Sequence, residues 1–80
     1  MGSNMAQQND RPFRTFQVRD ISHLHGNRPC FDIVFHDDEN SCERYSESVW
    51  DTHEAAELVA NHMEHNGSRP CHWDVLRKKA

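Results

Sequence analysis

One stretch of helical periodicity, flanked on both sides by strand-like segments, most limits what this chain can fold into. Its apolar residues recur at spacings of three and four: Ala55, Ala56, Leu58, Val59, Ala60 and Met63. Asp51, with Glu54 three residues later, forms an acidic variant of the capping box, and Thr52 is the other candidate cap. Asn66-Gly67 is a strong stop signal. We therefore predict one helix over about residues 52–66.

Alternation of apolar and polar residues predicts strands on both sides of this helix. The segment Phe31–Phe35 has the clearest pattern, because every second residue is large and apolar. We predict a strand over about 13–21 before it and a strand over about 42–49 after it. The pattern over 42–49 is poor, so we expect that strand at a sheet edge. A last strand is predicted over 71–76.

The element order β-β-β-α-β predicts an α+β fold, with one helix packed on one face of a three- to four-stranded, mostly antiparallel sheet. Eighty residues make one domain, which we expect over residues 11–77. Residues 1–10 are predicted to form a disordered tail, and residues 78–80 a basic tail. Residues 1–4 are either native or a cloning remnant. The expected core is Phe16, Val18, Phe31, Ile33, Phe35, Leu58, Val59, Met63, Trp73 and Val75.

A short pattern occurs twice in the chain. Residues 26–34 and 67–76 share a Gly, a small polar residue, Arg-Pro-Cys, then an aromatic residue, Asp and two aliphatic residues, with one residue inserted after the Cys of the second copy. Because the residue before proline is extended and proline cannot donate an N–H, we interpret both copies as strand entries. If the two strands are parallel neighbours, Cys30 and Cys71 start side by side and could share a disulfide or a metal.

Charge and cysteine content narrow the classes of function. Nine Lys and Arg against 13 Asp and Glu give a formal charge of -4, whereas a general nucleic-acid binder needs a basic face. The three cysteines are an odd number and no secretory leader is recognisable, so we expect free thiols and a cytoplasmic protein. No apolar run approaches the roughly 20 residues of a membrane span, so we expect no membrane partner.

The seven histidines raise the hypothesis of a small zinc-stabilised domain. Its candidate ligands are His62, His65, Cys71 and His72. The first two lie one helical turn apart, and the last two return after a short loop. The spacing does not match a Cys-x2-Cys zinc knuckle. Apart from this zinc, we expect no cofactor.

Catalytic motifs are not recognisable. His53-Glu54 lacks the second histidine of a His-Glu-x-x-His metalloprotease motif, and no cysteine has a nucleophile motif around it. We therefore expect a protein that is not an enzyme. One alternative is a nucleic-acid binder that uses a local basic patch, formed by Arg14, Arg19, Arg77, Lys78 and Lys79.

The stretch from Phe31 to Met63 resembles the small sheet-plus-helix arm domains at the start of phage-type integrases, in its order of strand, polar turn, strand and helix. The resemblance implies a similar fold and a DNA-binding sheet. The corresponding strands depart from a basic sheet, since they carry Arg44 against six acids: Asp32, Asp37, Asp38, Glu39, Glu43 and Glu47. We therefore interpret the resemblance as an analogy of fold.

The preferred hypothesis is a small interaction module that binds a protein partner or forms a homodimer. A sheet of this size has exposed edge strands, and an unpaired edge is a template for strand addition.

Overall fold

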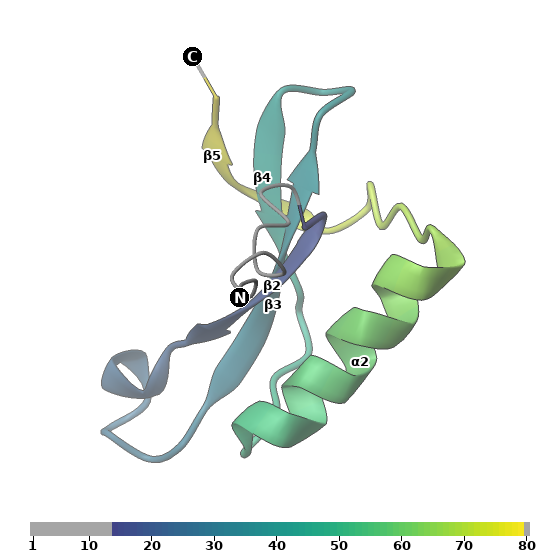
Figure 1. Cartoon of the computed structure of the whole chain (residues 1–80). Coiled ribbons are helices and arrows are strands. Elements are labelled where there is room, and N and C mark those ends of the chain that lie inside the picture. The colour runs from purple at the N-terminus through teal and green to yellow at the C-terminus, as the bar shows by residue number, and fades with distance from the viewer. Residues whose placement is uncertain (1–13, 80) are drawn as a thin grey trace, which may run out of the picture.

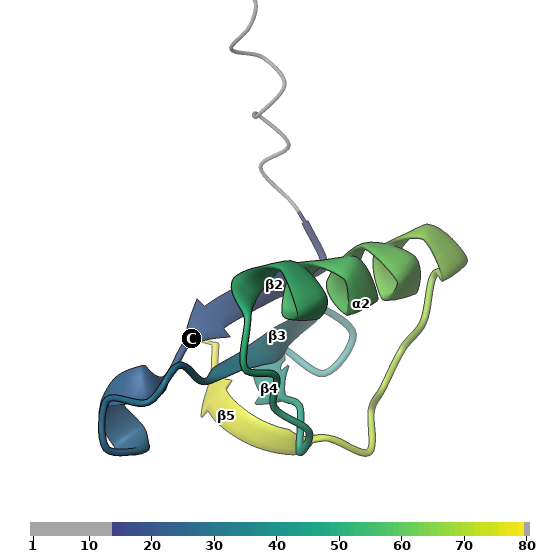
Figure 2. The same ribbon diagram turned by 90° about the horizontal axis from the view of Figure 1, so that it is seen from below.

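The computed structural model describes residues 14–79. Its elements are strands β2 (Phe16–Asp20), β3 (Phe31–Asp37), β4 (Cys42–Tyr45) and β5 (Asp74–Lys78), the short 3-10 helix η1 (Ser22–Leu24) and helix α2 (His53–Asn66) (Figure 1). The four strands form one antiparallel sheet in the order β2-β3-β4-β5. Helix α2 packs across β2 and β3 on one face (Figure 2). The predicted α+β fold is confirmed.

Helix α2 begins and ends at the residues that stereochemistry favours. The Thr52 hydroxyl accepts a hydrogen bond from Ala55 N at 3.1 Å, so Thr52 is the cap and the prediction of an Asp51 capping box was wrong. Gly67 has φ of 65°, in the left-handed region that a helix end often requires. The predicted helix over 52–66 agrees with the observed one to within one residue.

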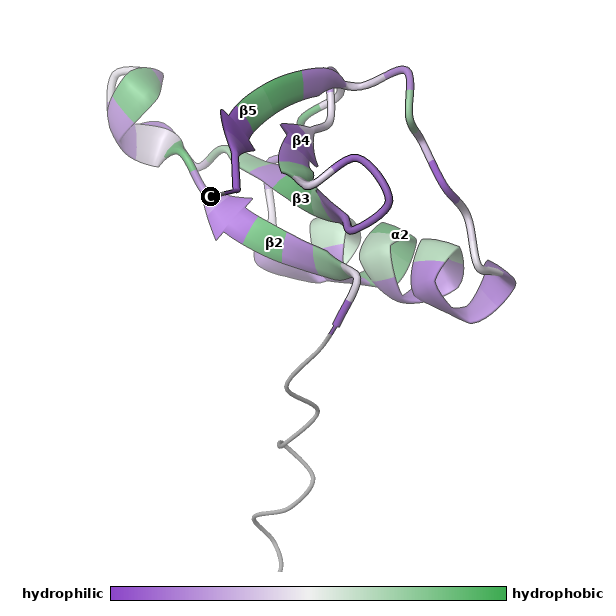
Figure 3. Cartoon of the chain, turned by 90° about the horizontal axis from the view of Figure 1, so that it is seen from above, coloured by the Kyte–Doolittle hydropathy of each residue, from purple (hydrophilic) through white to green (hydrophobic). Residues whose placement is uncertain are grey.

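The core lies between α2 and the two strands beneath it. Phe16, Ile33, Phe35 and Ala60 are fully buried, and the rings of Phe16 and Phe35 stack with centroids 5.1 Å apart. Apolar and polar bands alternate along β2 in Figure 3, as expected for a strand with one covered face. Small side chains such as Ala60 on α2 let the helix approach the sheet closely.

Two residues of the predicted core are exposed instead. Leu58 is 73% exposed and Val75 is 43% exposed. Leu58 is two residues from both Ala56 and Ala60, which are buried, so about 200° of helical rotation places it on the opposite side of α2. Val75 lies on β5, at the far side of the sheet from the strands that α2 covers.

The prediction that the third strand lies at an edge was wrong. β4 is an inner strand between β3 and β5, and it ends at Tyr45 rather than at residue 49. Beyond it, Trp50 forms an isolated bridge with Phe31. The charged side chains of β4 have cross-strand partners on both sides, which is why a charge-rich strand is stable inside this sheet. Glu43, for example, contacts both His36 and Arg77.

The repeated Arg-Pro-Cys pattern does not bring its cysteines together. β4 separates β3 from β5, so the two strands are not neighbours, and β5 starts at Asp74 instead of residue 71. Cys30 is buried, Cys71 is exposed in the turn before β5, and Cys30, Cys42 and Cys71 are free thiols.

Lys78 belongs to β5 rather than to a separate tail, and the predicted tail over residues 1–10 lies outside the described residues.

Candidate functional site

The face of the sheet opposite α2 carries a set of mostly polar side chains. In an antiparallel sheet, residues directly opposite each other on neighbouring strands share a face. The register pairs Gln17 with Val34, Val34 with Tyr45, and Arg19 with Asp32. We call this surface the open face. Its residues are Gln17, Arg19, Asp32, Val34, His36, Glu43 and Tyr45.

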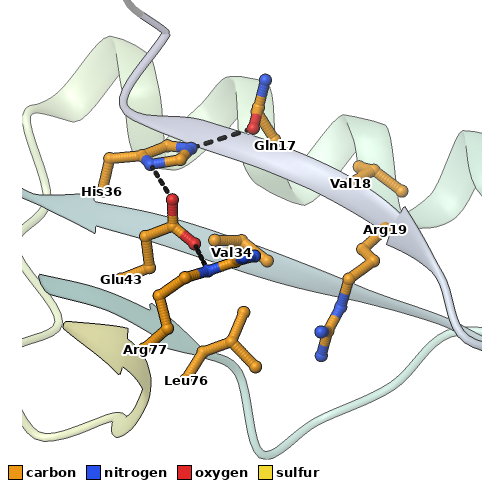
Figure 4. A pocket seen from close by; sticks show the side chains of 8 residues that line it. All are labelled: Gln17, Val18, Arg19, Val34, His36, Glu43, Leu76 and Arg77. Atoms are coloured by element: carbon orange, nitrogen blue, oxygen red, sulfur yellow. Dashed lines mark hydrogen bonds and ion pairs between the residues drawn. The ribbon is translucent and has the colours of Figure 1, made fainter. Parts of the chain in front are cut away.

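A pocket of about 290 Å³ lies on the open face and is lined from all four strands (Figure 4). Its lining consists of Gln17, Val18, Arg19, Val34, His36, Glu43, Leu76 and Arg77. Val34 is only 6% exposed and supplies an apolar base beneath the charged groups. Ligand pockets for small molecules usually span about 300–1,000 Å³, so this one suits a side chain better than a large substrate.

A chain of polar contacts crosses this pocket from β2 to β5. His36 Nε2 lies 2.9 Å from Gln17 Oε1, and His36 Nδ1 lies 3.5 Å from Glu43 Oε2 (Figure 4). Arg77 Nε donates to Glu43 Oε1 at 2.8 Å. When Nε2 donates to Gln17, Nδ1 carries a proton only in the charged imidazolium. Protonation of His36 therefore turns its contact with Glu43 into an ion pair.

Arg19 and Asp32 form the second polar group on the open face. Arg19 Nε and Nη2 donate to the two carboxylate oxygens of Asp32, at 3.0 and 2.7 Å. This hydrogen bonding raises the pKa of Arg19. The Asp32 side chain is only 3% exposed, whereas that of Arg19 is 35% exposed. A guanidinium has five N–H donors, so three N–H groups of Arg19 remain that do not donate to Asp32.

Within residues 14–79, the backbone of β2 forms one edge of the sheet. His36 N donates to Thr15 O at 2.8 Å, and Ile21 N donates to Cys30 O at 2.9 Å. Because hydrogen-bonded pairs alternate in an antiparallel ladder, these two bonds place the odd-numbered residues of β2 toward β3 and the even-numbered residues outward. The outward N–H and C=O groups belong to Phe16, Val18 and Asp20.

Glu64 of helix α2 closes one end of this edge. Its carboxylate accepts hydrogen bonds from Phe16 N at 3.0 Å and from Thr15 N at 3.3 Å. Within residues 14–79, no such side-chain partner is found for the outward N–H of Val18. Among the described residues, the outward backbone groups from Val18 to Asp20 have no hydrogen-bond partner, so this half of the edge is available to an added strand.

The edge of β5 is less suited to pairing. Glu43 pairs with Arg77 and Arg44 with Val75, so Leu76 is an extra residue and β5 contains a bulge. The end of the strand is basic, with Lys78 exposed. Bulges and lysine side chains both discourage edge-to-edge pairing. Of the two edges, β2 is the better template.

A buried carboxylate on the opposite face serves the fold. Asp37 is fully buried and accepts hydrogen bonds from Asn40 Nδ2 at 2.8 Å, Arg44 Nε at 2.9 Å and Arg69 Nη2 at 3.2 Å. The hydrogen bond from the Asn40 side chain, helped by Arg44, lowers the pKa of Asp37 to about 2. Asp37 thus ties β3 to β4 and to the segment that precedes β5.

The candidate zinc ligands are not assembled into a cluster. His62 and His65 lie on an exposed side of α2, and His62 Nε2 is 3.0 Å from Asn66 Nδ2. Cys71 and His72 lie in the exposed turn before β5. In the portion of the chain that the structure describes, no group of three or more His, Cys, Asp or Glu side chains is placed to hold a metal ion.

The candidate basic patch is largely engaged in ion pairs with the protein's own carboxylates. The pairs are Arg14–Glu57, Arg19–Asp32, Arg77–Glu43 and Lys79–Asp38. These residues also come from different parts of the structure: the approach to β2, β2 itself and the end of β5. They therefore do not form the single continuous basic surface that binding to a phosphate backbone needs.

Sequence reasoning named Arg19 and Arg77 but missed Gln17, His36 and Glu43. A single polar residue in a strand is an ordinary observation, and only the register shows that these side chains meet.

Comparison with known protein families, curated proteins and solved structures finds no match for the chain. Across residues 14–79, no helix combines the length and apolarity that a membrane crossing requires.

Proposed function

We propose that this chain is a non-enzymatic interaction module that binds an extended segment of a partner protein as an added strand along β2. One observation carries the proposal: the outward backbone groups of Val18 and Asp20 form an edge that α2 leaves open beyond Glu64. The three free thiols suit a reducing, cytoplasmic environment.

The free part of the edge is short, so we expect modest affinity. Each added backbone hydrogen bond contributes about 0.5–1.5 kcal/mol net. Side-chain pairs across the new strand boundary add about 0.2–1 kcal/mol each. Such a complex would form and dissociate readily, as is common for edge-binding modules. The nucleic-acid alternative has weaker support, because the candidate basic residues come from different parts of the structure and do not form one basic surface.

The proposal is tested by selecting peptides from a random peptide library displayed on phage. Enriched peptides are then measured against the wild type and against Val18→Pro, which removes the outward N–H. Proline is tolerated at an edge position whose N–H faces outward, so this variant should keep its fold. Val18→Ala is the matched control, because it shortens the side chain and keeps the N–H. Circular dichroism verifies that both variants are folded.

We expect Val18→Pro to weaken peptide binding by about tenfold or more, since it removes a hydrogen bond and places a ring where the new strand would approach. Val18→Ala should stay close to the wild type. Failure to enrich any peptide, or equal binding to Val18→Pro, would contradict the proposal. Light scattering over a concentration series adds one further outcome: a dimer that Val18→Pro abolishes would assign the edge to a second copy of the chain.

A further inference from the structure

We infer that the partner strand carries an aspartate or glutamate directly opposite Arg19, so that this module selects acidic extended peptides. The inference rests on the proposed strand addition at β2 and specifies the chemistry of the partner. It follows from the register of the edge and from the way in which Asp32 holds Arg19.

The outward groups of Val18 fix which partner side chains reach the open face. A partner residue that exchanges hydrogen bonds with Val18 lies directly opposite it. The side chains of its two neighbours then lie on the other face of the sheet, opposite Gln17 and Arg19. Directly opposed side chains have Cβ atoms about 4.5–5.5 Å apart, which is within reach of an ion pair.

Arg19 is prepared to bind a second carboxylate. Asp32 holds it from the β3 side through Nε and Nη2, so the guanidinium is fixed in orientation. The remaining N–H donors, including both on Nη1, lie away from this pair. A carboxylate on the added strand would complete a row of acid, Arg19 and acid across three neighbouring strands. Hydrogen bonds between two charged groups are among the stronger ones in proteins.

The charge of Arg19 itself favours an acid over a base at this position, and the acids nearest to it on the open face are already paired, Asp32 with Arg19 and Glu43 with Arg77. A partner lysine or arginine would face the guanidinium with like charge, which is destabilising. Asp20, the nearest acid on β2, alternates to the face that carries α2 and accepts hydrogen bonds from Ser22 N at 2.9 Å and Ser22 Oγ at 2.6 Å.

The test is a charge swap that preserves the ion pair. In Arg19→Glu/Asp32→Arg the cross-strand pair remains, with its polarity reversed and the net charge unchanged. Peptides are selected from the same displayed library on this variant and on the wild type. A matched control swaps the Lys79–Asp38 pair, which lies away from β2 at the end of the sheet, as Lys79→Asp/Asp38→Lys. Circular dichroism verifies each fold.

We expect wild-type peptides to share one Asp or Glu at a fixed position, and the swapped variant to select Lys or Arg there. The control swap should select acidic peptides, as the wild type does. Replacing the shared acid of a wild-type peptide by its amide should weaken binding about fivefold. This measurement needs only the wild-type protein, so it holds even if the swapped variant does not fold.

Two results would overturn the inference while strand addition survives. One is equal binding of the acid and amide peptides to the wild type; the other is selection of acidic peptides by the swapped variant. In both, loss of binding in Val18→Pro still supports the edge. Failure to enrich any peptide on the wild type would overturn both proposals together.

Discussion

Replacing Ser46 by alanine gives a quantitative test of how the sheet is stabilised beyond the end of β4. Ser46 Oγ accepts a hydrogen bond from Ile33 N at 3.1 Å and donates one to Ser48 O at 2.8 Å. Ser46 is 4% exposed and Ile33 is fully buried, so water cannot replace the lost acceptor. An unsatisfied buried donor costs about 1–3 kcal/mol. Ser48 is exposed, so its carbonyl can bind water instead.

We therefore expect Ser46→Ala to lower the free energy of unfolding by about 2 kcal/mol. For a domain of this size, 1 kcal/mol corresponds to about 4–8 °C in the melting temperature, so the expected decrease is about 8–16 °C. A chain of 80 residues typically has about 4–12 kcal/mol of stability, so the variant should still fold.

Thermal and urea unfolding followed by circular dichroism measure this difference. Ser48→Ala is the matched control, because among the described residues only the main chain of Ser48 takes part in the hydrogen bond. Its stability should remain within about 0.5 kcal/mol of the wild type. If Ser46→Ala melts within about 3 °C of the wild type, the Ile33 N–H does not depend on this hydroxyl for its hydrogen bond.

Three further measurements test other parts of the structure. In amide hydrogen exchange, Val18 should exchange quickly and Gln17 slowly, because the first N–H faces outward and the second faces β3; equal protection would contradict the assigned edge. The pKa of Asp37 is lowered from 3.8 to about 2 in the folded protein, so its ionised form adds stability at pH values above 3.8. This contribution is lost as the pH falls from about 4 to about 2. The urea midpoint of the wild type should therefore fall more steeply in that range than the midpoint of Asp37→Asn. Cys71 should react with a thiol reagent in the native protein, whereas Cys42, which is 2% exposed, should react only on unfolding.

The elements of this fold could be predicted because their signals are local. Thr52 and Gly67 bound the helix within a few residues of the side chains that cap it, and the alternation in β3 depends only on neighbouring positions. The position of β4 could not be predicted in the same way. It depends on pairing with β5, which follows the helix in the sequence. The first paired residue of β5, Asp74, lies opposite Tyr45 of β4.

The candidate site was accessible to sequence reasoning only in part. Arg19 was named as a basic residue, but its carboxylate partner follows from the β2–β3 register, which places it opposite Asp32. The spacing of His62 and His65 is sound for shared ligation, yet the chain turns before β5 and leaves Cys71 exposed. Spacing shows which groups could meet, and the path of the chain decides whether they do.

The way in which β5 is attached to the sheet allows two copies of the chain to exchange this strand. Within the described residues, β5 pairs with β4 alone, most of its residues are exposed, and residues 67–73 connect it to α2. Few buried contacts oppose its release, so we expect it to be the first strand to open in local unfolding. Its departure would turn β4 into a second edge, and that edge accepts the sequence of β5 itself. The sheet therefore contains the elements of a domain swap, in which each copy completes its neighbour with its own last strand.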